Sequence, residues 1–153
     1  MKVYRVLAYL VAAAVVFQAA TIAYALFALG SWVEKGGVLD KAAMEGSGGV
    51  GGEGGLMAHG NGALATAALG LALLVCSFFV KVPGAKKWAA IVFGLIVLQW
   101  VLGFVSFAVP GLGVLHGINA LAVMGTAMSA ATTVGRAARA PEAVAAETPA
   151  PVG

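Results

Sequence analysis

The chain alternates between long apolar runs and short charged segments. Charged side chains are absent from residues 6–33, 54–80 and 88–135, and the last run is divided by the turn-forming segment Pro110-Gly111-Leu112-Gly113. A helix needs about 20 apolar residues to cross a hydrocarbon layer of roughly 30 Å. The pattern therefore predicts four membrane-spanning helices. They cover about 6–30, 60–80, 88–108 and 112–135.

The composition indicates the same class of protein. Hydrophobic residues make up 61% of the chain and charged residues only 10%, which is far from the balance of a soluble domain. The first apolar run is also longer than the core of a signal peptide, so we expect a retained helix. The predicted fold class is an all-α integral membrane protein, an up-down four-helix bundle embedded in a lipid bilayer.

The predicted membrane domain covers residues 1–139. A connection at about 31–58 joins the first two spans, and its second half, GSGGVGGEGG from Gly46, predicts a flexible tether. Residues 140–153 are rich in Ala, Pro and Glu, and predict a disordered cytoplasmic tail.

The basic residues predict an orientation. Seven of the nine Lys and Arg residues lie before the first span, between the second and third spans, or after the fourth span. The positive-inside rule places these segments, and so both termini, in the cytoplasm of a multi-pass protein of the cytoplasmic membrane. The net charge of +3 is explained by this distribution and calls for no nucleic-acid partner.

A short pattern occurs twice along the chain. The septet HGNGALA begins at His59 and HGINALA begins at His116, and these are the only two histidines. Each septet follows a helix with a central glutamine, Gln18 or Gln99, at a separation of 41 or 17 residues. The glycine-rich insertion accounts for the difference in spacing. The sequence therefore predicts an internal repeat, two copies of one helix hairpin arranged as parallel repeats.

The two histidines are predicted to lie at similar depths. Counted from Lys81 and Arg136 at 1.5 Å per residue, His59 and His116 lie roughly 33 and 30 Å above the inner boundary. Both helices enter from the outer side, so they occupy one diagonal of an up-down bundle, with axes roughly 12–14 Å apart. That separation suits an imidazole–metal–imidazole bridge near the outer leaflet.

Small residues follow each histidine along the same helix face, as far as Gly70 in the second span and Ala127 in the fourth. Such faces leave room for a flat cofactor, although they are also common where membrane helices pack together. Because imidazole is a common axial ligand of haem iron, the pattern favours haem b with two histidine ligands. The predicted cofactor-binding residues are His59, His116, Gly62, Ala63, Asn119 and Ala120, of which His59 and His116 would bind the metal.

The two glutamines are the other polar residues shared by the repeats. Counted from Arg5 and Lys87, Gln18 and Gln99 lie roughly 20 and 18 Å above the inner boundary, level with each other and below the histidines. Hydrogen bonding between helices is the main expectation for their side chains. Contact with a quinone or with the edge of a macrocycle is the alternative.

The arrangement resembles one four-helix half of haem A synthase. The segment Gln99-Trp-Val-Leu-Gly103, followed by Leu115-His116 and Ala120, is similar to the third-to-fourth helix pattern of that family. The resemblance implies that His59 and His116 occupy the positions of the haem ligands. The chain is also similar to small four-span bacterial membrane proteins of a family of unknown function.

The departures from the synthase bear on activity. Ala58 stands where that family has a glutamate, the outer connection lacks its pair of cysteines, and the chain corresponds to a single half. No carboxylate lies within a span, and no Ser–His–Asp set is evident, so we do not expect an enzyme.

Three functions remain open. The first is a cytochrome b-like protein for electron transfer, redox sensing or haem handling, with a membrane or extracytoplasmic redox partner. The second is a structural subunit or scaffold of a membrane complex without cofactor, as a homo- or hetero-oligomer. The third is copper binding, because Met57 and Met124 add soft thioether ligands near the histidines.

Overall fold

The computed structural model describes residues 1–45 and 49–147, and within this part of the chain all regular structure is helical. The helices are α1 (Lys2–Glu34), α2 (Lys41–Glu45), α3 (Glu53–Ser77), α4 (Ala85–Ala108) and α5 (Leu112–Glu147). Helices α1, α3 and α4, and the part of α5 up to Ala137, are long and apolar enough to cross a membrane. The predicted class, a multi-pass all-α membrane protein, is confirmed.

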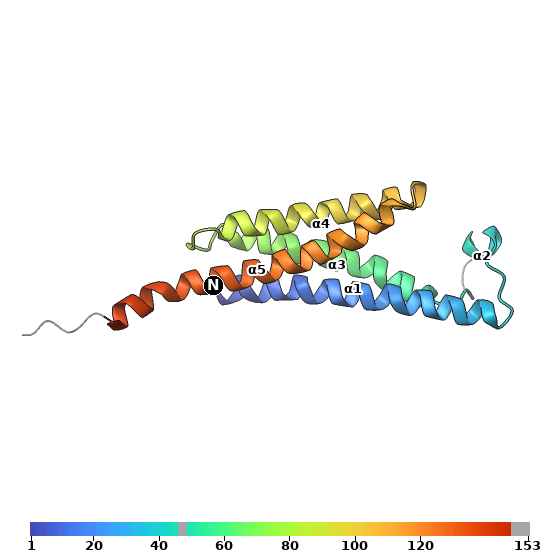
Figure 1. The fold of residues 1–153 in the computed structure, drawn as a ribbon, viewed down its shortest axis with the longest axis horizontal. Coiled ribbons are helices and arrows are strands. Elements are labelled where there is room, and N and C mark those ends of the chain that lie inside the picture. The colour runs from blue at the N-terminus through green and yellow to red at the C-terminus, as the bar shows by residue number, and fades with distance from the viewer. Residues whose placement is uncertain (46–48, 148–153) are drawn as a thin grey trace, which may run out of the picture.

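The four long helices form an up-down bundle (Figure 1). Helix α1 packs against α3 and α5, and α4 packs against the same two helices, so α3 and α5 lie on one diagonal. We call the end that carries α2 and the α4–α5 turn the α2 end, and the opposite end, with the start of α1 and the α3–α4 connection, the Tyr4 end. The predicted bundle topology is correct.

The connection between the first two spans is shorter than the sequence predicts, because α1 extends to Glu34 and α3 begins at Glu53. The glycines allow this by close approach to α1. Gly52, at φ +87°, lies directly against the Ala25 carbonyl, and a Cβ at Gly55 would lie 2.7 Å from the carbonyl oxygen of Thr21. Helix α3 thus begins inside the glycine-rich segment; its role as a flexible tether stays a prediction, and residues 46–48 lie outside the described residues.

The C-terminal segment contains the predicted tail. Helix α5 continues to Glu147 and extends beyond the bundle at the Tyr4 end (Figure 1), so residues 140–147 are helical, and disorder of the tail stays a prediction. The physical reason is the alanine content of this stretch, since alanine has the highest helix propensity. The remainder of the predicted tail, 148–153, lies outside the described residues.

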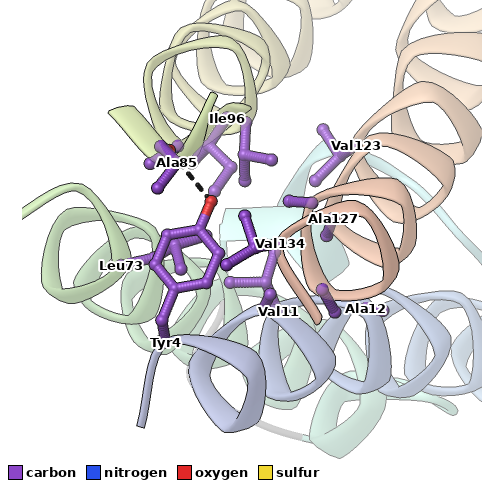
Figure 2. Packing of buried hydrophobic residues seen from close by; sticks show 14 of the residues in the cluster. Tyr4, Val11, Ala12, Leu73, Ala85, Ile96, Val123, Ala127 and Val134 are labelled. Carbon is purple, nitrogen blue, oxygen red and sulfur yellow. Dashed lines mark hydrogen bonds between the residues drawn. The ribbon is translucent and has the colours of Figure 1, made fainter. Parts of the chain in front are cut away.

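A closed core fills the bundle toward the Tyr4 end (Figure 2). Tyr4 is fully buried, and its hydroxyl donates a 3.0 Å hydrogen bond to the carbonyl of Ala85 at the start of α4. Around it pack fully buried aliphatic side chains from the four long helices. They include Val11, Leu73, Val92, Val123 and Val134.

The outer surface of the bundle is apolar. Phe27, Phe79 and Phe107 are 82%, 80% and 89% exposed. Such extensive apolar exposure indicates a membrane environment, because contact with hydrocarbon removes the cost that water would impose.

The α2 end has no comparable core. No residue from Val97 to Ile118 is buried, which covers the last half of α4 and the first turns of α5. Figure 1 shows the α4–α5 turn standing apart from the end of α1. The bundle is therefore tightly closed at the Tyr4 end and looser at the α2 end.

Candidate metal site

The two histidines meet between the diagonal helices, near the α2 end. His59 lies in the second turn of α3 and His116 in the second turn of α5. Their ring centroids are 6.4 Å apart, with an angle of 56° between the ring planes, and both side chains are half-buried. The sequence-based expectation that the rings are level and face across the diagonal agrees with this geometry.

Each histidine makes the same contact with the preceding long helix. The Nδ1 atom of His59 lies 3.1 Å from the carbonyl oxygen of Gln18 in α1, and that of His116 lies 3.1 Å from the carbonyl oxygen of Gln99 in α4. A carbonyl oxygen can only accept, so Nδ1 of each neutral ring carries the hydrogen and donates it. The lone pair of each ring then resides on Nε2. Metal-binding histidines are commonly oriented in this way.

The spacing of the rings matches coordination of one metal ion. Metal–imidazole bonds are about 2.0–2.1 Å long, so two rings bound to opposite sides of one ion have centroids roughly 6.3 Å apart. The observed separation is 6.4 Å. Two neutral imidazoles that both present acceptors also have no direct hydrogen bond to make with each other. The centroid separation is therefore compatible with both rings binding one metal ion.

The glutamines lie beside the histidines, so their predicted position below the histidines is wrong. Gln18 and Gln99 contact the histidine helices at the level of the rings. The error arose from counting depth from charged residues. Helix α3 ends at Ser77, before Lys81, whereas Arg5 already lies inside α1. The count therefore placed the histidines too far out and the glutamines too far in.

The glutamine side chains join helices, as expected, but do so differently in the two halves. Gln18 donates from Nε2 to the carbonyl of His59 at 2.9 Å, which links α1 to α3. Gln99 accepts at Oε1 from Nδ2 of Asn119 at 2.7 Å, which links α4 to α5. Asn119 Nδ2 also lies 2.9 Å from the carbonyl of Leu95. The prediction of interhelical hydrogen bonds is confirmed.

Gly62 and Asn119 are equivalent positions of the repeat, three residues after each histidine. Because Gly62 has no side chain, Gln18 Oε1 lies directly against it. This oxygen is buried and has no hydrogen-bond donor within the described residues. The two halves of the site thus share their histidine contacts but differ in their glutamine contacts.

Side chains of neighbouring helices occupy part of the space beside the small residues that follow the histidines. Ile96 of α4 lies directly against Gly70, so the predicted small-residue face is closed at that depth. Ala63 and Ala120, one turn after the histidines, are half-buried. Contact of Gly62, Ala63, Asn119 and Ala120 with a cofactor stays a prediction.

The soft ligands proposed for copper do not gather at the rings. Met57 is 62% exposed and lies two residues before His59, an offset that places the two on different sides of a helix. Met124 packs against the buried core, two turns beyond His116. Among the side chains of residues 1–44 and 49–137, no group of three or more His, Cys, Asp or Glu could hold a metal ion.

Two further residues shape the site: Thr21, which was missed in the sequence, and Gly103, which was noted only as the end of the segment Gln99-Trp-Val-Leu-Gly103. The Thr21 hydroxyl donates to the Gln18 carbonyl at 3.0 Å, the same oxygen that His59 contacts. A Cβ at Gly103 would lie 3.3 Å from Cε1 of the His116 ring. The only available signal was their spacing, three residues after Gln18 and four after Gln99, which places each one turn from the glutamine.

Comparisons with family models, curated proteins and solved structures return no match for this chain. The resemblance to half of haem A synthase consequently rests on the residues quoted for it. The histidine geometry is the strongest guide to function.

Proposed function

We propose that the protein is a b-type haem-binding membrane protein in which His59 and His116 are the two axial ligands. Its membrane is the cytoplasmic membrane, with both termini in the cytoplasm, so that the α2 end faces outward and the site lies near the outer leaflet. The orientation follows from the basic residues at the Tyr4 end.

One observation carries this proposal: the paired contacts of the two rings. Both Nδ1 atoms lie 3.1 Å from equivalent carbonyls, and the ring centroids are 6.4 Å apart. Two histidines in an otherwise apolar bundle are costly unless they have a role, because polar side chains in a membrane are usually retained for function.

The limited protein ligand set favours haem over a bare ion. Two imidazoles leave most coordination positions of a metal to be filled, and a porphyrin supplies four equatorial nitrogens. With a single cysteine, the chain has no C-x-x-C-H motif for covalent attachment, so the haem would be of the b type. The haem would supply a redox-active iron, whose potential depends on its axial ligands and their hydrogen bonds.

The closed core at the Tyr4 end favours a role on one side of the membrane. Electron exchange with an outer or membrane-embedded partner, redox sensing and haem handling each fit a site that lies near the α2 end, away from the closed core. The Gln18 and Gln99 carbonyls would orient the two rings, and the buried aliphatic core would exclude water from below.

The test is a dithionite-reduced minus oxidised absorbance spectrum of the full chain, expressed with ample haem. We expect a low-spin b-type spectrum for the wild type. His59→Ala and His116→Ala should each convert it to a high-spin form or lose the haem. Added imidazole should restore the low-spin spectrum in the variants, since it can replace a missing ligand but not a missing structural contact.

The copper hypothesis is tested on the same preparations. Met57→Leu, which leaves both histidines intact, should not change the haem spectrum, and purified wild type should contain iron rather than copper. Equimolar copper without a Soret band would contradict the proposal. A folded, stable wild type that binds neither metal would also contradict it, and would instead favour a structural subunit whose bundle packs through Gly62 and Gly70.

A further inference from the structure

The carbonyl oxygen of Gln18 is shared by two side-chain donors. Thr21 Oγ1 lies 3.0 Å from it and His59 Nδ1 lies 3.1 Å from it. As a residue within α1, Gln18 also offers this oxygen to the backbone N–H four residues later. Three donors therefore compete for an oxygen that has two lone pairs.

The corresponding carbonyl in the other half has one side-chain donor fewer. His116 Nδ1 lies 3.1 Å from the Gln99 oxygen, and no other side chain in the described part of the chain donates to it. The position equivalent to Thr21, three residues after the glutamine, is Leu102, which has no hydroxyl.

This difference changes the chemistry of the two rings even though the two distances are equal. A hydrogen bond from Nδ1–H raises the electron density, and so the basicity, of the ring as a metal ligand. An oxygen that is shared with a second hydroxyl polarises the Nδ1–H bond less. The Nδ1–H of His59 therefore shares its acceptor with a second side chain, whereas the Nδ1–H of His116 does not.

From this asymmetry we propose that Thr21 is a positioning residue that makes His59 the weaker of the two metal ligands. The proposal rests on the proposed haem site and adds to it an unequal pair of ligands. Removing the Thr21 hydroxyl strengthens the hydrogen bond that Nδ1–H of His59 donates. Adding a hydroxyl at Leu102 weakens that of His116.

The first experiment needs no haem and uses the full chain in detergent micelles. In nitrogen-15 NMR spectra, Thr21→Val should move the His59 Nδ1–H proton downfield and slow its exchange with water, bringing it close to that of His116. Leu102→Thr should have the opposite effect on His116. Thr21→Ser, which keeps a hydroxyl, should resemble the wild type. Unchanged His59 signals in Thr21→Val would overturn the proposal.

The second experiment measures the midpoint potential of the haem-loaded protein. Thr21→Val should make the potential more negative, because a more basic ligand stabilises ferric iron, and Leu102→Thr should make it more positive. Thr132→Val removes a hydroxyl that bonds to the carbonyls of Met128 and Ser129 in α5, away from the rings, and should leave the potential unchanged. Equal potentials in Thr21→Val and wild type would contradict the proposal.

The two experiments separate the possible failures. If no haem binds but the NMR changes occur, the haem function is wrong, and the unequal hydrogen bonding of the two rings stands. If haem binds and neither measurement responds to the Thr21 hydroxyl, the site is correct and the role of Thr21 is refuted.

Discussion

The contact between Asn119 and Gln99 predicts a measurable loss of stability when it is broken. Asn119 is 7% exposed, and its Nδ2 donates to Gln99 Oε1 at 2.7 Å and approaches the Leu95 carbonyl at 2.9 Å. Replacing Asn119 with alanine removes both contacts and leaves Gln99 Oε1 without its donor. The first half of the site already contains such an oxygen, on Gln18.

The expected magnitude follows from these contacts. Hydrogen bonds between membrane helices contribute about 0.6 kcal/mol on average and at most about 1.7 kcal/mol. An acceptor left without a partner adds about 1–3 kcal/mol when it is fully buried, and Gln99, which is half-buried, should carry the lower part of that range. Because the Leu95 carbonyl keeps its bond within the helix, only Gln99 Oε1 carries that penalty. We expect Asn119→Ala to lower the free energy of unfolding by about 2 kcal/mol, which is about a thirtyfold change in the folding equilibrium.

The assay is reversible unfolding in mixed micelles, followed by helical circular dichroism. A double-mutant cycle with Gln99→Leu tests the origin of the loss, because the double variant has no Gln99 Oε1 left without a donor. The double variant should therefore be more stable than the sum of the two single losses predicts. Ser129→Ala, which removes an exposed hydroxyl bonded within α5, serves as control and should change stability by less than about 0.5 kcal/mol. A loss for Asn119→Ala no larger than the control, or strictly additive losses, would refute the reasoning.

Two further substitutions test the packing around the site and the core. Gly103→Val should displace the His116 ring, since even a Cβ at this position would lie 3.3 Å from Cε1, and it should reduce the low-spin fraction in the haem spectrum. Gly94→Val is the control, because a Cβ at Gly94 meets nothing within 4 Å, and it should leave the spectrum unchanged. Equal effects of the two substitutions would argue against a close contact between Gly103 and the ring. Tyr4→Phe should cost about 0.6 kcal/mol for its interhelical hydrogen bond, whereas Tyr4→Ala should cost about 3–5 kcal/mol, because it empties a buried site. The unfolding titration measures both Tyr4 variants, and equal losses would show that the hydroxyl, rather than the ring, provides the stability.

Much of the fold was predictable because crossing a membrane is a local property of the chain. Runs of about 20 apolar residues are long enough to span the hydrocarbon by themselves. Because each span crosses to the opposite side of the membrane, successive spans are antiparallel, and an up-down order places the second and fourth spans on one diagonal. The repeated septets also correctly indicated that His59 and His116 meet, because equivalent positions in repeated hairpins lie at equal heights.

The boundaries were less predictable because they depend on contacts between helices. The start of α3 inside a glycine-rich segment was not foreseen, since glycine opposes helix formation in isolation. Gly52 and Gly55 allow α3 to approach the backbone of α1 closely. The local sequence pattern does not indicate that this close approach is needed. The depths of the histidines and glutamines, counted from charged residues, were wrong because those residues do not mark the helix ends: Lys81 lies in a connection and Arg5 lies inside a helix.

The length and spacing of the apolar segments are enough to specify the number of spans, their antiparallel order and the pairing of the two histidines. The contacts within the site could be seen only in the packed bundle. Each ring directs its Nδ1 to a glutamine carbonyl, and Asn119 donates to Gln99. Gly62 provides no donor for Gln18 Oε1, and Ile96 packs against Gly70. These contacts depend on the rotation and close approach of neighbouring helices. Spacing along a single helix constrains neither quantity, so the asymmetry of the site became visible only in three dimensions.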